Sequence, residues 1–208
     1  MPHAERDSAF LNIPYDPDYE DHFLAYIAGV AAYGLDPRAT LELTSGERRL
    51  DRICKLISAC RYSFHDLSFV ELDRTPPPTP RFNMPFELGL VIGWQNAASS
   101  GHDWFVFESS RHRIQKSLSD LNGTDAFIYG STVDGILREI RNALSRHGVQ
   151  PTAAQMMNIL DELIENSAPS IVRATGASSV FEARPFSEIA VAARRYAEVW
   201  VPGLSRNS

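Results

Sequence analysis

The stretch LDRICKLISACRYSFHDL, residues 50–67, decides the fold class, because it joins an amphipathic helix directly to an apolar strand. In its first half, apolar side chains recur at helical spacing, and arginine, lysine and aspartate occupy other positions. This apolar stripe consists of Leu50, Ile53, Cys54, Ile57 and Cys60. We expect both cysteines to lie in the core. Residues 62–67 then have the length of a strand and are predicted to form the third strand.

Apolar runs and amphipathic segments alternate on both sides of this unit over the first 147 residues. The other predicted strands are residues 9–13, 40–43, 104–107 and 125–129. The other predicted helices are residues 19–33, 83–98 and 133–144. Thr44 and Glu47 have the spacing of a capping box before the helix of the opening stretch. Five strands separated by helices predict an α/β fold, a flavodoxin-like five-stranded parallel sheet with helices on both faces.

Pro151 interrupts this alternation, and the chain beyond it carries two further helical stripes. We therefore divide the chain into an α/β domain at residues 1–149 and a C-terminal helical extension at residues 150–208. Four large side chains of the stripes are Met156, Met157, Tyr196 and Trp200. They either complete the core or form a dimer interface.

The composition is that of a globular protein, with 44% apolar residues, 22% charged residues and a formal net charge of −6. The negative charge disfavours a nucleic-acid partner. No apolar run approaches the length of a membrane-spanning helix, so we expect no membrane association. The two cysteines and the polar N-terminus indicate a cytoplasmic protein.

Several motif-bound activities are disfavoured because their motifs are absent. The sequence has no Walker-type phosphate loop, no Gly-x-Gly-x-x-Gly after a strand and no Gly-x-Ser-x-Gly. The six histidines are scattered and no Cys-x-x-Cys occurs, so we expect no metal site. We also expect no resident cofactor.

Polar residues concentrate where the predicted topology places a ligand site, beyond the carboxyl ends of the first and third strands. The candidates there are Tyr15, Asp16, Asp66, Ser68, Arg81, Asn83 and Glu87. Asn83 can cap the helix that contains Glu87. Arg81 and the amides of that helix N-terminus can hold a phosphate, or Arg81 is an exposed loop residue. Tyr15 can stack on a base, or it is a surface tyrosine.

Glu87 is the strongest candidate for a reacting group. No other charged residue occurs between Arg81 and Asp103, and helical spacing places Glu87 on a covered face with Val91 and Trp94. Burial of this kind raises the pKa of a carboxyl group. The alternative is that Glu87 bonds a loop backbone or completes the helix N-terminus. Gly89 and Gly93 are expected to let the same helix approach a neighbour closely.

Asp66 follows the apolar part of the third strand and is either a catalytic or ligand-binding carboxylate or the residue that closes the strand in a turn. His65 precedes it, but adjacent strand residues point to opposite faces, so the two are not expected to cooperate. Asp66 and Glu87 converging on one cleft would suit glycosidic chemistry. The basic residues Arg111, Arg113 and Lys116 are expected to form a solvated face, with a second anion contact as the alternative.

The segment His65-Asp66-Leu67-Ser68, followed by Asn83 to Gly89 and by Gly93, resembles the nucleoside 2-deoxyribosyltransferase-like superfamily and bacterial TIR-like domains. The resemblance covers roughly residues 8–147. It implies cleavage or transfer at an N-glycosidic bond of a nucleoside, a nucleotide or NAD, with NAD as substrate rather than cofactor. In that resemblance, Glu87 matches the catalytic glutamate and Asp66 the aspartate near the sugar or base.

The resemblance also implies self-association, so a homo-oligomer is expected. The alternative function is a non-catalytic module of the same fold that senses a nucleotide or acts as a protein-interaction adaptor. The sequence leaves the base, the sugar, and the choice between hydrolase and transferase open.

Overall fold

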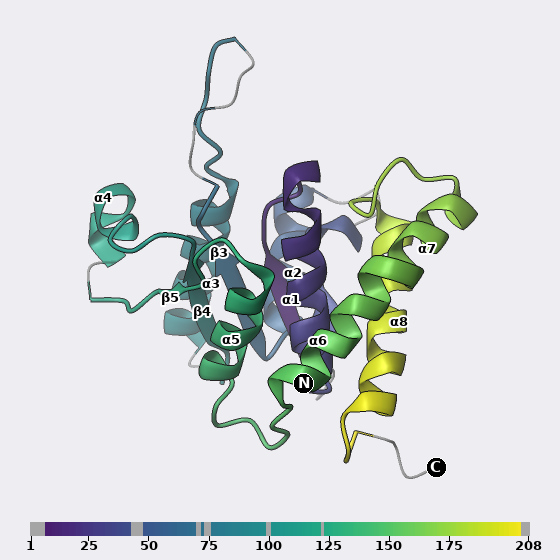
Figure 1. Ribbon diagram of the computed structural model, residues 1–208. Coiled ribbons are helices and arrows are strands. Elements are labelled where there is room, and N and C mark those ends of the chain that lie inside the picture. Colours follow the sequence, from purple (N-terminus) through teal and green to yellow (C-terminus); the bar gives the residue numbers. More distant parts are fainter. Residues whose placement is uncertain are drawn as a thin grey trace.

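A computed structural model of the chain describes residues 7–42, 48–69, 72, 76–98, 101–121 and 123–204 (Figure 1). Five strands form one sheet in the order β2-β1-β3-β4-β5, and every neighbouring pair is parallel. The strands are β1 (Ser8–Asn12), β2 (Asp36–Arg38), β3 (Tyr62–Asp66), β4 (Asp103–Glu108) and β5 (Phe127–Ile128). The structure therefore confirms the predicted α/β fold with a flavodoxin-like parallel sheet.

The helices lie on both faces of this sheet. Those of the α/β part are α1 (Glu20–Ala32), α2 (Arg49–Ala59), α3 (Asn83–Ala98), α4 (Ile114–Ser117) and α5 (Val133–Ala143). The C-terminal helices are α6 (Ala153–Glu162), the π-helix η4 (Leu163–Ser167), α7 (Ala168–Thr175) and α8 (Ala183–Trp200). Short 3₁₀ helices are η1 (Pro17–Tyr19), η2 (Thr40–Glu42) and η3 (Ser119–Leu121). Among the described helices, none combines the length and apolar character needed to cross a membrane.

Strand side chains alternate between two cores. Leu11 and Phe64 face the side covered by α1, whereas Phe10 packs with α2 and with Val91 of α3. This alternation follows from the two-residue period of a strand. Both faces of this parallel sheet are buried, so its strands need apolar residues on both faces. This explains why much of the strand sequence is continuously apolar.

Helix α1 is covered on every side. One side packs on the sheet, and α5, α6 and α8 cover the rest (Figure 1). Gly29 permits the approach of α5, because a Cβ atom there would lie 2.4 Å from Cδ1 of Ile140. Met156 of α6 is fully buried in the same core cluster, so this side chain completes the core rather than forming a dimer interface. Trp200 remains 40% exposed.

Two details of the second strand and the following turn differ from expectation. The predicted strand at residues 40–43 is wrong, because β2 lies earlier, at Asp36–Arg38, and residues 40–42 form η2. The Glu42 carboxylate stabilises this turn by accepting hydrogen bonds from Arg38 Nε and the Ala39 amide, both at 2.8 Å. Pro37 concealed β2, although an edge strand tolerates proline. The expected capping residues Thr44 and Glu47 lie outside the described residues.

The stripe of α2 is also narrower than predicted. Cys60 is buried as expected, but Cys54 is exposed and Leu50 is 44% exposed. Leu56 is buried instead, together with Ile53 and Ile57. The buried face of α2 therefore does not include positions 50 and 54.

Candidate active site at the carboxyl edge of the sheet

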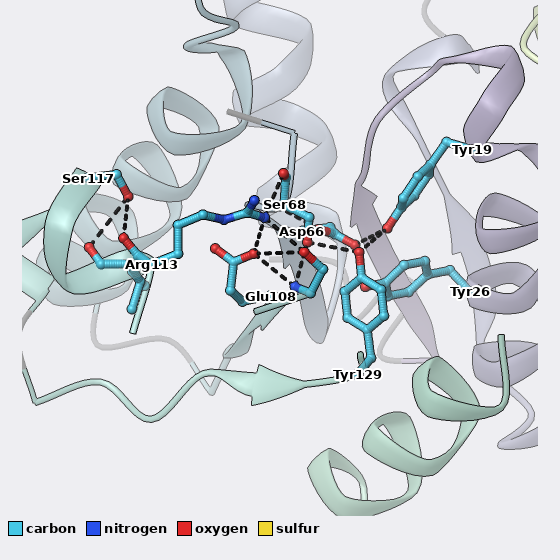
Figure 2. Close-up of polar contacts among 10 residues, drawn as sticks. Tyr19, Tyr26, Asp66, Ser68, Glu108, Arg113, Ser117 and Tyr129 are labelled. Atoms are coloured by element: carbon cyan, nitrogen blue, oxygen red, sulfur yellow. Dashed lines mark hydrogen bonds and ion pairs between the residues drawn. The ribbon is translucent and has the colours of Figure 1, made fainter. Parts of the chain in front are cut away.

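Asp66, the last residue of β3, is fully buried and accepts three hydrogen bonds. Tyr19 and Tyr26 both donate their hydroxyl hydrogens to Oδ2, the latter at 2.8 Å (Figure 2). The Ser68 amide donates to Oδ1 at 2.9 Å. Burial raises the pKa of Asp66, although these donors oppose the rise. Because Asp66 is 0% exposed, a substrate hydroxyl would reach this carboxylate only after the side chains around it had moved.

The hydrogen bonds continue from Asp66 to the next strands. Tyr19 Oη lies 2.8 Å from Tyr129 Oη, and Tyr129 donates to Ser68 Oγ at 2.8 Å. The amide of Ser109 also donates to Ser68 Oγ at 2.8 Å. Tyr129 directly follows β5, so this set of contacts joins the carboxyl ends of β3, β4 and β5. Ser68, one of the predicted site residues, is where they meet.

Arg113 holds the outer side of this network. Its guanidinium group forms an ion pair with Glu108 and donates to the Ser68 carbonyl at 2.7 Å and to Ser109 Oγ at 2.9 Å (Figure 2). The hydrogen bond to Glu108 raises the pKa of Arg113. The expectation that Arg113 belongs to a solvated basic face is therefore wrong.

Sequence reasoning missed four members of this network, namely Tyr19, Tyr26, Glu108 and Tyr129. One signal was present in the sequence. Tyr19 and Tyr26 are seven residues apart, which places them on the same side of a helix. Glu108 and Tyr129 directly end or follow apolar strands, the same position that singled out Asp66.

Glu87 has a different environment. It lies in α3, is 5% exposed, and accepts no hydrogen bond or ion pair from any described residue. Burial raises its pKa to about 7, against an opposing influence from Arg49. Tyr15 is close enough for its pKa to be raised by Glu87 and lowered by Arg49, after a larger increase from burial. The predicted buried carboxyl group is present, and the alternative of a loop-bonding glutamate has no partner among the described residues.

The remaining candidates surround the first turn of α3. Tyr15 bonds Thr40 Oγ1 at 2.9 Å and packs edge-on against Phe23, so its ring belongs to the core rather than to an open stacking site. Asp16 caps η1 and lies 3.7 Å from Arg81, whose guanidinium group also covers the Phe69 ring. Asn83 is the first residue of α3 and is exposed.

A second buried network anchors α3 to the sheet. Asn12 Nδ2, at the end of β1, donates to His65 Nδ1 at 2.8 Å and to the Met84 carbonyl at 2.9 Å. His65 Nε2 lies 2.9 Å from Ser63 Oγ. His65 thus faces α3 while Asp66 faces α1, which confirms that the two side chains point to opposite faces of the sheet.

An apolar groove of about 500 Å³ lies beside the start of α3. Its lining includes Leu67, Arg81, Phe82 and Phe86, and the two phenylalanines are 66% and 55% exposed. Leu67 precedes Ser68 and Phe86 precedes Glu87. The groove therefore touches both segments, although neither Ser68 nor Glu87 is part of its lining.

No protein-family model matches this chain, and no curated protein matches it either. The site must be interpreted from its own chemistry. Among the residues that the structure describes, no group of three histidine, cysteine, aspartate or glutamate side chains is placed to hold a metal ion. The expectation that Gly89 and Gly93 allow close packing is wrong, because both are exposed and a Cβ at either would have no described neighbour within 4 Å.

Proposed function

We propose that this protein cleaves or transfers an N-glycosidic bond of a nucleoside or nucleotide, with Glu87 as the reacting carboxylate. The observation that carries this proposal is the burial of Glu87 without a partner among the described residues. A buried carboxyl group without a structural partner is costly to maintain, and such groups concentrate at functional sites. A pKa near 7 leaves a large fraction of Glu87 ionised at neutral pH.

The chemistry follows from the charge that develops during bond cleavage. As the bond from C1′ of the sugar to the base breaks, positive charge accumulates on C1′ and the ring oxygen. The Glu87 carboxylate would stabilise this charge or form an ester bond to C1′, and water or a second base would then attack C1′. The groove with Phe82 and Phe86 offers aromatic surface beside α3 on which a base can stack.

The same groove favours a second candidate function, a module that binds a nucleotide without turnover. Two exposed phenylalanines beside an arginine form a surface suited to a flat, anionic ligand. This candidate requires no reaction at Glu87.

The test is incubation of the purified protein with NAD, NADP, nucleosides and nucleoside monophosphates, followed by chromatography of the released base. We expect release that falls by about 100-fold or more in Glu87→Gln. Glu198→Gln is the matched control, because Glu198 is exposed on α8, and it should retain full activity. Equal release by Glu87→Gln and wild type would refute the role of Glu87. Absence of release from every substrate, with nucleotide-dependent thermal stabilisation, would favour the binding module.

A further inference from the structure

We propose that a proton relay runs from Asp66 through two tyrosines to the Ser68 hydroxyl, and that it protonates the departing base. The substrate is then a nucleoside or nucleotide with a neutral base, rather than NAD. This inference rests on the proposed function and specifies its substrate class. It is drawn from the contacts that join Asp66, Tyr19, Tyr129 and Ser68 in Figure 2.

The number of hydroxyl hydrogens limits how the four residues can be hydrogen-bonded to one another. Three contacts join the four residues in series: Asp66 to Tyr19, Tyr19 to Tyr129, and Tyr129 to Ser68. Each contact requires one hydrogen, but the two tyrosine hydroxyls supply only two. The third must come from one end of the chain, either from a protonated Asp66 or from the Ser68 hydroxyl. The series is therefore complete in two forms that differ by the direction of every hydrogen bond.

Burial determines which of the four hydrogen-bonded residues can exchange a proton with solvent or a ligand. Asp66 is 0% exposed, Tyr129 is 2% exposed and Tyr19 is 8% exposed, and the His22 ring stacks on Tyr19 at 4.6 Å. Ser68 is half-buried, so it is the most accessible member. A proton from the buried Asp66 carboxyl group can therefore pass through the two tyrosines to Ser68, at the carboxyl edge of the sheet.

The geometry around Ser68 prepares it to donate outward. In the form with protonated Asp66, Ser68 Oγ accepts hydrogen bonds from Tyr129 and from the Ser109 amide, both at 2.8 Å. Its own hydrogen can then go to a ligand, in competition with the Asp66 carboxyl group, with which the Ser68 side chain also interacts. Arg113 fixes the Ser68 carbonyl at 2.7 Å, which holds this residue in position.

The bond between C1′ and the base nitrogen breaks, and its electron pair stays on the base. The base takes the Ser68 hydrogen, Ser68 takes that of Tyr129, Tyr129 that of Tyr19, and Tyr19 that of Asp66, which becomes a carboxylate. When water or a second base then bonds to C1′, the hydrogen it loses returns along the same chain to Asp66.

This chemistry selects the substrate class. A purine or pyrimidine joined to a sugar is neutral and leaves as an anion, so its departure is accelerated by a proton. The nicotinamide of NAD carries a positive charge while bonded and leaves as a neutral molecule. A relay that supplies a proton therefore benefits the first kind of substrate and not the second.

The activity test compares each natural nucleoside with 4-nitrophenyl riboside, whose leaving group departs without a proton. In Tyr129→Phe we expect the ratio of the nucleoside rate to the nitrophenyl rate to fall by about 100-fold. Tyr196→Phe is the matched control, because the Tyr196 hydroxyl bonds Ser167 Oγ at 2.9 Å, outside the network of Asp66, and its ratio should stay at the wild-type value. A ratio unchanged in Tyr129→Phe, or wild-type cleavage of NAD faster than of every nucleoside, would overturn the proposal.

A second measurement separates failure of the relay from failure of the proposed function. The exchange of the Tyr19 hydroxyl hydrogen with water can be followed by proton NMR without any substrate. We expect Tyr129→Phe and Ser68→Ala to slow this exchange by on the order of tenfold, and Tyr196→Phe, outside the network, to leave it unchanged. Slowed exchange in a protein that cleaves nothing would support the relay and refute the glycosidic function. Unslowed exchange would refute the relay while leaving Glu87-dependent release intact.

Discussion

Asp66 and Glu87 approach the carboxyl edge of the sheet from opposite faces. Asp66 points toward α1, where Tyr19 and Tyr26 bind it, on the face that also carries Phe64. Glu87 belongs to α3, whose Val91 packs on the other face. The two carboxyl groups share no partner among the described interactions. This separation suits two tasks, with Asp66 committed to an internal network and Glu87 left without a hydrogen bond from the described residues.

The first prediction concerns the stability cost of Glu87. Its pKa rises from 4.5 to about 7 through burial, so the folded state favours the protonated form. The resulting stabilisation is complete below pH 4.5 and is lost as the pH rises through 7. Glu87→Gln, a neutral mimic, should therefore increase the free energy of unfolding at pH 8 by at most about 3 kcal/mol. Urea denaturation at pH 4.5 and pH 8 measures this difference.

The control for that experiment is Glu198→Gln on the exposed surface of α8, which should change the free energy of unfolding little at either pH. If Glu87→Gln instead destabilised the protein at both pH values, Glu87 would have a structural role.

Strand and helix patterns predicted most of the fold, because they depend on burial that is local in sequence. The stretch at residues 62–67 and the helix at residues 83–98 agree closely with β3 and α3. Errors occurred where tertiary contacts override local pattern. Pro37 concealed β2, and Cys54 lay on the predicted stripe of α2 but faces solvent.

The site was predicted only in part, for a physical reason. Glu87 and Asp66 were visible because a charge stands in apolar sequence at each position. The contacts of Tyr129 with Ser68 and Tyr19 span 61 and 110 residues, and no local pattern encodes such pairs. The relay could therefore be recognised only after the ends of β3 and β5 had been placed together.

The second prediction concerns acid sensitivity through His65. Burial, with a smaller contribution from His102, lowers the pKa of His65 from 6.5 to about 3. The unfolded chain then binds a proton that the folded protein does not, so stability falls as the pH decreases from 6.5 toward 3. His65→Gln should show a flatter dependence of the free energy of unfolding on pH across this range. Denaturation at pH 7.5, 5.5 and 4.5 checks the slope.

His112→Asn provides the comparison for His65. His112 is exposed and has a φ of 64°, which asparagine tolerates. Its pH profile should match that of the wild type. A His65→Gln profile as steep as the wild-type profile would assign the acid sensitivity to other groups.

The third prediction concerns the ion pair between Arg113 and Glu108. The Glu108 side chain is 1% exposed, and its Oε2 has no hydrogen-bond partner among the residues that the structure describes. Arg113→Met should cost about 3–5 kcal/mol, because it leaves a buried carboxylate without its cation. Combining it with Glu108→Leu should recover part of the loss, as a double-mutant cycle would measure. Arg111→Met, at an exposed position, should have little effect. Equal losses from the two arginine substitutions would show that the pair contributes nothing particular.

The fourth prediction compares two glycines whose surroundings differ. A Cβ on Gly135 would lie 1.8 Å from the Tyr129 carbonyl oxygen and 2.8 Å from Thr132 Oγ1, the cap of α5. Gly135→Ala should therefore cost about 3 kcal/mol or more and displace Tyr129, which would also disrupt the relay. Gly89 is an exposed helical position with nothing within 4 Å of its Cβ position, so Gly89→Ala should stabilise the protein by about 1 kcal/mol. Thermal denaturation of both variants tests the contrast, and destabilisation by Gly89→Ala would place an unseen neighbour against α3.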